Sequence, residues 1–297
     1  MAALMRQPDF FVVGAAKSGT TALWKYFQKH PDVFVTDTIE AKELGYYSNQ
    51  YGVSSKSEYL SFFKNAEPDQ LIGEVCHVYL TSNESADWIK QEVPNAKIII
   101  MLRNPVERAY SLYNWMIMHG YEYQNSFEKA LEQEKLLFQD KKPKHQLLHR
   151  FRKNYHYFNS GKYYEQVKRF YDFFGKANVL VIEYDNFNKN QIRSLTRIFE
   201  FLKIDKTHDI SELKTNESNR VKSVLLQYWL RKLYLSRYGI NPRVKQLINT
   251  IMSKNITKKK PKKINEDTKL KLRDNYKEDV QKLTQLTGID FYKKWYD

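Results

Sequence analysis

The sequence has a single cysteine, Cys76, among 297 residues. One thiol excludes an internal disulfide and a zinc site built from several cysteines, and it favours a reducing compartment. The seven histidines show no spacing typical of zinc ligands, so we expect no metal site. No run of about eighteen apolar residues occurs, and no basic-then-apolar leader opens the chain. We therefore expect a soluble, cytoplasmic protein without stable membrane insertion.

Acidic residues are also scarce relative to basic ones, 34 against 49, and the formal net charge is +15. Such a field attracts anions, which include nucleotides, sulfated or carboxylated acceptors, nucleic acid and membrane surfaces. The charge is taken to be spread along the chain, so we expect no nucleic-acid partner. The one obvious run of lysines, residues 258–263, is interpreted as a solvated loop in preference to a polyanion site. Hydrophobic residues make up 42% of the chain, which is typical of a folded globular protein.

Short runs rich in Ile, Val and Phe alternate with amphipathic segments. The predicted strands are residues 10–13, 71–75, 97–102 and 178–184. The predicted helices cover about residues 20–30, 57–63, 83–92, 105–118, 163–174, 192–202, 221–235 and 272–283. This order favours an α/β fold with a parallel sheet covered on both faces. We see no repeat and no linker before residue 250, and we expect one domain over residues 1–297.

The stretch from Pro8 to Pro31 holds a strand, a loop of small residues and a helix that the second proline closes. In this layout backbone N–H groups and the positive end of the helix converge on an anion. Lys17 adds a full charge, and nearby hydroxyls add donors. We interpret the loop as a phosphate-binding site made by Lys17, Ser18, Gly19, Thr20 and Thr21.

The lysine of this loop is not where a triphosphate-binding loop has it. In the pattern G-x-x-x-x-G-K-[ST] the lysine follows the second glycine. Here the sequence is G-x-x-K-S-G-T-T, and Lys17 precedes the glycine by two positions. The loop resembles the 5′-phosphosulfate loop of sulfotransferases that use 3′-phosphoadenylyl sulfate (PAPS). The resemblance implies a P-loop-like nucleotide-binding fold with PAPS as co-substrate.

Further matches to the sulfotransferases extend over most of the chain. The stretch LRNPVERAYSLYNW resembles the family segment in which an Arg at a strand end and a Ser eight residues on bind the donor's 3′-phosphate, which implies this role for Arg103 and Ser111. Tyr184, in IEYDNF, resembles the family tyrosine that contacts adenine, although a buried tyrosine at a strand end is equally compatible. Residues 216–222 resemble the basic segment over the 3′-phosphate, which implies contacts from Arg220 and Lys222. The family more often has Pro-Arg at the last two positions, and either cation could instead cap a helix.

The resemblance implies transfer of a sulfuryl group from PAPS to a hydroxyl or amine of a small-molecule or carbohydrate acceptor, which leaves adenosine 3′,5′-bisphosphate (PAP). By analogy with phosphoryl transfer, the protein positions the reactants and neutralises charge on the leaving oxygen. Lys17 and the helix N-terminus would hold the departing phosphate without a metal.

Two residues are candidates for the base that takes the acceptor's proton. Residues 42–47 resemble the Lys-Glu-x-His-Phe-Phe segment of the heparan-sulfate branch, where the Glu is the presumed base, and this implies Glu43. Gly45 stands where that segment has its His. His77 lies where the small-molecule branch keeps its catalytic histidine. The heparan-sulfate branch has a lysine in this region that is missing here. The sequence leaves Glu43 and His77 open, and both could act.

Two other functions are kept as alternatives. A nucleotide kinase with a degenerate loop would bind ATP with magnesium, for which Asp9 and Glu74 are possible carboxylates. A basic binding module would hold nucleic acid or sulfated glycan without turnover. No residue names the acceptor, whose pocket we expect residues 49–69 and 121–157 to shape.

Overall fold

The computed structural model describes residues 6–49, 52–138, 155–206, 219–236 and 241–296. The chain divides into two compact units. The first unit comprises Met1–Asn104, Lys162–Thr215 and Lys277–Asp297, and the second comprises Pro105–Gly161 and Asn216–Tyr276. The single domain expected over the whole chain stays a prediction.

The first unit is built on a five-stranded sheet of β1 (Phe10–Gly14), β2 (Val33–Phe34), β3 (Leu71–Val75), β4 (Lys97–Leu102) and β5 (Val179–Glu183). The order is β2-β3-β1-β4-β5, and every neighbouring pair is parallel. Val12 of β1 lies between Val75 of β3 and Ile99 of β4. The predicted parallel sheet is confirmed, and the carboxyl ends of β1, β3, β4 and β5 meet at one edge.

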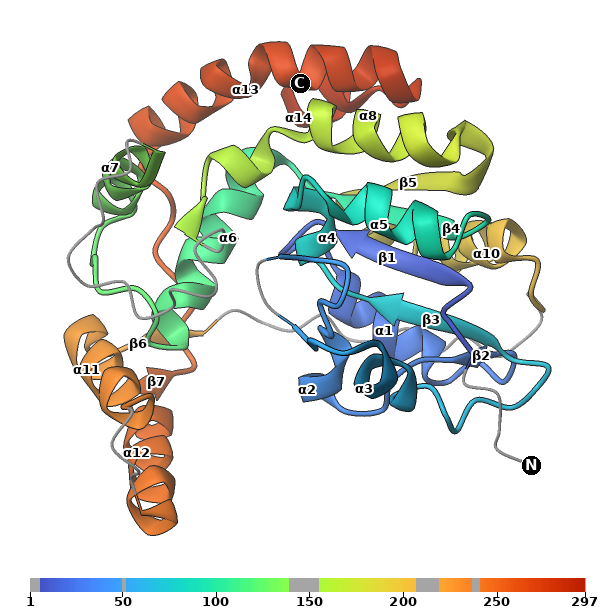
Figure 1. Cartoon of the computed structure of the whole chain (residues 1–297). Helices are drawn as coiled ribbons and strands as arrows, with labels where there is room; N and C mark the ends of the chain where they lie inside the picture. Colours follow the sequence, from blue (N-terminus) through green and yellow to red (C-terminus); the bar gives the residue numbers. More distant parts are fainter. Residues whose placement is uncertain (1–5, 50–51, 139–154, 207–218, 237–240, 297) are drawn as a thin grey trace. The chain divides into compact units, whose positions relative to one another are not determined.

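Helices cover both faces of this sheet (Figure 1). On one face α1 (Thr20–Phe27) and α10 (Gln191–Leu202) pack on alternate strand residues in a core that includes Phe10, Val12, Leu23, Phe27, Ile99 and Leu195. On the other face lie α4 (Val78–Thr81), α5 (Ser85–Glu92) and α8 (Tyr163–Phe174). Because both faces are covered, β1, β4 and β5 are apolar along nearly their whole length.

Shorter elements complete the first unit. They are α2 (Ile39–Lys42), α3 (Lys56–Ser61), η3 (Lys176–Asn178), α9 (Tyr184–Lys189), α14 (Phe291–Tyr296) and the later part of α13 (Glu266–Thr287). The predicted strand 178–184 ends early, at Glu183, because that side chain caps α9. Its carboxylate accepts hydrogen bonds from the N–H groups of Asp185 and Asn186, at 3.1 and 2.7 Å. Tyr184 therefore begins a helix.

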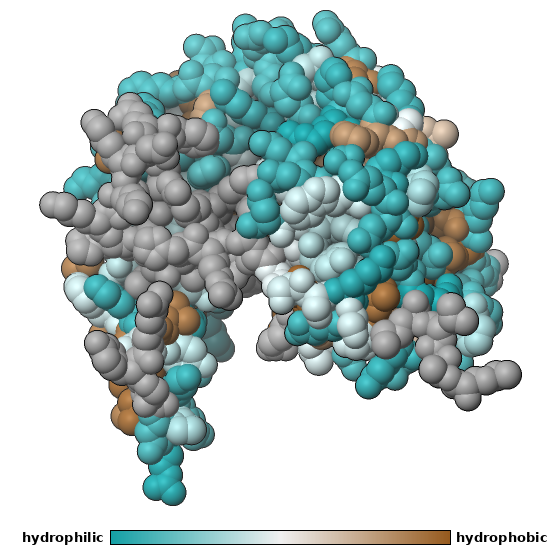
Figure 2. All heavy atoms as spheres, in the orientation of Figure 1, coloured by the Kyte–Doolittle hydropathy of each residue, from teal (hydrophilic) through white to brown (hydrophobic). Residues whose placement is uncertain are grey.

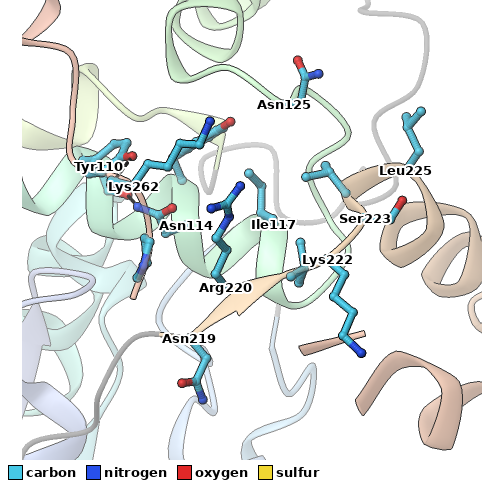
Figure 3. A pocket seen from close by; sticks show the side chains of 14 residues that line it. Tyr110, Asn114, Ile117, Asn125, Asn219, Arg220, Lys222, Ser223, Leu225 and Lys262 are labelled. Atoms are coloured by element: carbon cyan, nitrogen blue, oxygen red, sulfur yellow. Dashed lines mark hydrogen bonds between the residues drawn. The ribbon is translucent and has the colours of Figure 1, made fainter. Parts of the chain in front are cut away.

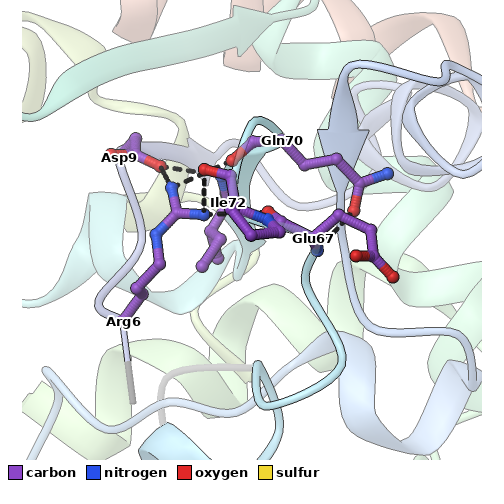
Figure 4. A network of polar contacts seen from close by, with 6 residues as sticks. Arg6, Asp9, Glu67, Gln70 and Ile72 are labelled. Atoms are coloured by element: carbon purple, nitrogen blue, oxygen red, sulfur yellow. Dashed lines mark hydrogen bonds and ion pairs between the residues drawn. The ribbon is translucent and has the colours of Figure 1, made fainter. Parts of the chain in front are cut away.

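A network around Arg6 fixes the opposite, amino-terminal edge of the sheet (Figure 4). The guanidinium donates to the carbonyls of Glu67 and Gln70, at 3.0 and 2.9 Å, and contacts Asp9 at 3.4 Å. Asp9 in turn accepts from the backbone N–H of Ile72 at 2.8 Å. These bonds join the start of β1 to the start of β3.

The second unit contains α6 (Pro105–Met118), α7 (Phe127–Phe138), η2 (Asn159–Gly161), β6 (Arg220–Val221), α11 (Val224–Tyr234), α12 (Pro242–Lys254), β7 (Ile256–Thr257) and the start of α13. The helix predicted over 221–235 begins at Val224, since β6 pairs antiparallel with β7. Ser223 is its cap, and its Oγ accepts from the N–H of Leu226 at 3.2 Å. None of the described helices is both long and apolar enough to cross a bilayer.

Candidate active site

The loop between β1 and α1 leaves the sheet at its carboxyl edge and turns sharply. Lys17 has φ of +64°, and Gly19, the residue before α1, has φ of +90°. A Cβ at Gly19 would lie 2.9 Å from Cδ2 of Tyr184. The glycine is therefore required both by the left-handed backbone and by the close approach of the tyrosine ring. The N–H of Ala15 donates to the carbonyl of Met101 at 2.7 Å, which ties the loop to β4.

The hydroxyl groups of the loop lie around the start of α1. Ser18 and Thr20 are buried, and Thr21 is half-buried. Among the described residues Oγ of Ser18, although buried, has no hydrogen-bond partner. The first N–H groups of a helix also lack partners within the helix. This donor set, a hydroxyl and a helix N-terminus beside a lysine, fits the oxygens of a phosphate group.

Three cations lie close together beside this loop. The pKa of Lys17 is lowered to about 8, first by burial and then by the positive charges of Arg103 and Lys42. Arg103 follows β4, the neighbour of β1 in the sheet, and its carbonyl accepts from the Tyr163 hydroxyl at 3.0 Å. The predicted pair of Lys17 and Arg103 is thus brought to one place, and its charge favours an anionic ligand.

Tyr184 lies against the same two groups. The guanidinium carbon of Arg103 is 5.1 Å from the centre of the Tyr184 ring, and the ring also lies close to Gly19. The tyrosine is half-buried and keeps part of its surface accessible. A flat aromatic surface beside a phosphate-binding loop suits a purine, and the predicted contact with adenine stays a prediction.

Glu43 and His77, the two candidate bases, are hydrogen-bonded to each other. Oε2 of Glu43 lies 2.9 Å from both the backbone N and Nδ1 of His77, while Oε1 accepts from Nζ of Lys42. Burial raises the pKa of Glu43, but the charges and hydrogen bonds of His77 and Lys42 outweigh it and hold that pKa well below its usual range. An ionised carboxylate only accepts, so Nδ1 of His77 carries the proton of this bond. Nε2 is then the ring's acceptor.

The position of this pair follows from the sheet. His77 comes two residues after the end of β3, and its carbonyl lies 3.2 Å from where a Cβ of Gly14 would stand. Because Gly14 is the last residue of β1, the backbone of His77 lies next to the start of the phosphate loop. The side chains of His77 and Glu43 are 24% and 26% exposed, which leaves both accessible to a substrate.

A second carboxylate, Glu74, is buried inside the fold. Glu74 on β3 accepts from the hydroxyls of Tyr59 and Tyr79, each at 2.5 Å. Burial raises the pKa of Glu74 to about 7.

Asp9, the other carboxylate of the kinase alternative, is bound by Arg6 and by the backbone N–H of Ile72 at the other edge of the sheet. The two carboxylates that the kinase alternative requires therefore have other partners, and nothing in their contacts supports a shared magnesium ion.

A depression of about 460 Å³ opens beside Glu43. Its lining comes from the segment around α2 and α3, and only the part after residue 49 belongs to the stretch expected to shape the acceptor pocket. Its residues are Thr38, Ala41, Glu43, Leu44, Gly52, Val53, Ser54, Glu58 and Phe62. Two carboxylates and no cation belong to this lining, so it suits a neutral or cationic group.

The remaining predicted residues lie in the second unit. Ser111 is half-buried on α6. Arg220 lines a pocket of about 410 Å³ together with Tyr110, Asn114 and Lys262. Figure 3 shows the guanidinium of Arg220 pointing toward α6 and the ammonium of Lys222 pointing away. Ser223, and neither of these cations, is the N-cap of α11, while the predicted contacts of Arg220 and Lys222 with the 3′-phosphate stay predictions. Residues 216–218 of the predicted segment lie outside the described residues.

Sequence reasoning missed Lys42. Its side chain is only 2% exposed and is paired with Glu43, and its charge also lowers the pKa of Lys17. A lysine next to a glutamate in sequence is usually solvated, so only the fold reveals it. Lys42 links the base pair to the phosphate loop electrostatically.

A family model described as the sulfotransferase domain matches residues 7–287. The chain belongs to this family. The predicted membership of the sulfotransferase family is therefore confirmed. The roles of the individual residues stay predictions.

Curated sulfotransferases match parts of the chain. The membrane-associated sulfotransferase kil1 of Dictyostelium discoideum is 35% identical over 116 residues, 38% of this chain and 24% of that protein. The bifunctional heparan sulfate N-deacetylase/N-sulfotransferase 1 of Caenorhabditis briggsae is 23% identical over 197 residues, 66% of this chain and 22% of that protein. The matches thus span about a quarter of the length of these relatives.

Solved sulfotransferases share the fold. The structure from Alicyclobacillus acidocaldarius has a TM-score of 0.67 and 23% identity, covering 98% of this chain and 100% of that one. Mouse SULT7A1, crystallised with PAP, has a TM-score of 0.50 and 19% identity, covering 98% and 88%. The predicted sulfotransferase fold is confirmed by these likenesses.

Proposed function

We propose that this sulfotransferase transfers the sulfuryl group of PAPS to a hydroxyl or amine and releases PAP. The observation that carries the proposal is the convergence of Lys17, Arg103 and Lys42 at the loop, where burial first and then the two neighbouring charges lower the pKa of Lys17 to about 8. Such a cluster of charge is compensated when anionic phosphate and sulfate groups bind. Ser18 and the N-terminus of α1 supply donors for the same oxygens.

Lys17 acts on the leaving group. In the reaction a bond forms between sulfur and the acceptor atom while the bond from sulfur to the 5′-phosphate oxygen breaks. Negative charge grows on that oxygen, and the Lys17 ammonium neutralises it. Arg103, whose planar fork matches phosphate, holds the donor at the same edge of the sheet.

His77 acts on the acceptor. Its Nδ1 donates to Glu43, so Nε2 takes the proton of the acceptor hydroxyl or amine. Glu43 orients the ring and balances the charge of the imidazolium that forms. Because Lys42 and two donors of His77 hold Glu43 ionised, it is the weaker base of the two. Glu43 is thus a positioning residue.

The acceptor binds in the depression beside Glu43. The carboxylates of Glu43 and Glu58 in its lining repel a polyanion, so we favour a neutral or aminated small molecule or sugar. The relatives named for heparan sulfate make a carbohydrate amine one class to test. The cytoplasmic location stays a prediction, since one relative is named membrane-associated.

Calorimetry with PAP and transfer assays with labelled PAPS test the proposal. The parent chain should bind PAP, and Lys17→Ala should lose that binding. Lys25→Ala, at an exposed position on α1, is the matched control and should bind as the parent does. Equal PAP affinity in the parent and the Lys17 variant would overturn the assignment of the loop.

The kinase alternative is separated by the same assays. A kinase would bind ATP with magnesium in preference to PAP and transfer phosphate from it. Tighter magnesium-dependent binding of ATP than of PAP would refute the sulfotransferase reaction in favour of the kinase.

A further inference from the structure

The positive charge of the chain is concentrated in one segment and is not evenly spread, contrary to the expectation from sequence. Residues 218–265 contain thirteen of the 49 Lys and Arg residues and none of the 34 Asp and Glu residues. The lysine run at 258–263 is only the end of this segment. Its described part forms β6, α11, α12 and β7 of the second unit.

The helices α11 and α12 pack against each other as a hairpin, and hydrogen bonds attach it to α6. Nε2 of Gln227 donates to the carbonyl of Met118 at 2.8 Å, which attaches α11 to the end of α6. Nδ2 of Asn255 donates to the carbonyl of Ser223 at 2.7 Å and to Oε1 of Gln227 at 2.8 Å. These bonds join the two ends of the hairpin to each other and to α6.

The outward side of the hairpin is apolar, the reverse of an ordinary surface helix. Leu225, Trp229 and Leu233 are four residues apart on α11, and Val244, Leu247 and Ile251 follow helical spacing on α12. All six are between 37% and 58% exposed. Figure 2 shows brown, apolar patches among teal and white side chains in the region of α11 and α12. Several large apolar side chains exposed on two neighbouring helices indicate an interaction site.

Cations stand beside these apolar side chains. Nζ of Lys232 lies 4.5 Å from the centre of the Trp229 ring. Arg243, Lys254 and residues 258–260 are exposed on the same segment. Apolar residues with tryptophan, flanked by cations and without acids, are the composition that lies in the interface of an anionic bilayer.

We propose that the hairpin of α11 (Val224–Tyr234) and α12 (Pro242–Lys254) docks on the surface of an anionic membrane. Leu225, Trp229 and Leu233 enter the headgroup region, and the lysines and arginines contact acidic lipids. A second copy of the chain would place two acid-free basic segments against each other, which opposes dimerisation through this face. A soluble polyanion would match the charge but leave the leucines in water. Docking is independent of the proposed sulfuryl transfer.

Sedimentation of the full chain with lipid vesicles tests this proposal. The protein should bind vesicles of phosphatidylcholine with phosphatidylserine and should not bind phosphatidylcholine alone. Binding should fall as salt rises, because the surface potential is screened. Failure to bind the anionic vesicles at low salt would overturn the proposal.

Substitutions separate the apolar and the charged contributions. Trp229→Ser and Leu233→Ser should each weaken vesicle binding about tenfold, while Leu270→Ser, an equally exposed leucine on α13, should not. Each change of Lys258, Lys259 or Lys260 to Gln should weaken it about fivefold. The matched single changes of the exposed Lys29, Lys64 or Lys189 to Gln should each have a smaller effect.

Two further outcomes would overturn docking of this face on a membrane. If vesicle binding is insensitive to Trp229→Ser and Leu233→Ser, electrostatic attraction alone accounts for it. The apolar side of the hairpin would then not be the docking element. A dimer in solution that Leu233→Ser converts to a monomer, without vesicle binding by the parent, would assign the face to a second copy. Sulfuryl transfer in the same variants is a separate readout and should stay near the parental rate.

Discussion

Oε2 of Glu43 accepts two hydrogen bonds from His77, one from the backbone N–H and one from Nδ1, both at 2.9 Å. The two candidates for the catalytic base are therefore partners. The double contact fixes the tautomer and the orientation of the ring, as a carboxylate does for a histidine that works as a base. The pairing leads to different expectations for the two substitutions.

His77→Ala should lower kcat for sulfuryl transfer by about 10²–10⁴, because the acceptor's proton then has no positioned acceptor. Glu43→Gln should cost less, since a glutamine oxygen can still accept from Nδ1. PAP affinity, measured by calorimetry, should be retained in both variants. A larger loss of kcat in the Glu43 variant than in the His77 variant would make Glu43 the base itself.

PAP affinity should depend on pH through Lys17. Since burial and two nearby cations lower the pKa of Lys17 to about 8, the free protein loses this charge above that pH. PAP needs the ammonium, so its affinity should fall as pH rises above 8, by up to about tenfold per unit. Calorimetry from pH 7 to pH 9.5 checks this. Lys25→Ala should keep the decline, whereas a decline of equal slope in Lys17→Ala would assign it to another group.

Gly19→Ala should impair both stability and PAP binding. The left-handed backbone at Gly19 costs an alanine about 1 kcal/mol, and its Cβ would lie 2.9 Å from the ring of Tyr184. Gly288→Ala is the matched control, because Gly288 has φ of +72° with nothing within 4 Å of the added carbon. Denaturant unfolding should show a loss of about 1 kcal/mol in the control and more in the Gly19 variant. Unchanged PAP affinity in Gly19→Ala would argue against a ligand beside Tyr184.

Glu74→Gln should change how stability depends on pH. Burial raises the pKa of Glu74 to about 7, above its ordinary value of 4.5, so the folded state keeps a proton that the unfolded chain releases. Stability is therefore lost as pH rises from about 4.5 to 7, with a slope of at most about 1.4 kcal/mol per unit. Urea unfolding at several pH values should show a smaller loss in Glu74→Gln than in the parent. Glu58→Gln, at an exposed site on α3, is the control and should show the same pH dependence as the parent. If the free energy of unfolding falls equally with pH in the parent and in Glu74→Gln, the loss does not come from Glu74.

Much of the sheet could be predicted because its strands are buried on both faces. Residues 98–102 are a continuous apolar run and residues 71–75 are apolar except for Gly73 and Glu74, and these stretches appear in β4 (Lys97–Leu102) and β3 (Leu71–Val75) with the predicted bounds. The helices α7 and α12 and the two-residue strands were missed. Their patterns are short or interrupted by charge, and tertiary pairing decides them.

Local sequence was sufficient for the strand, turn and helix around Lys17, for the place of Arg103 after β4 and for the sulfotransferase family, because spacing within a strand, a turn and a helix carries that information by itself. It named Glu43 and His77 but could not pair them, since 34 residues separate them and the parallel pairing of β2 with β3 brings the segments that follow these strands together. Burial of Lys42 and exposure of the apolar side of α11 were likewise decided by tertiary structure. Both depend on which side of a helix meets the rest of the protein, and composition does not encode that choice.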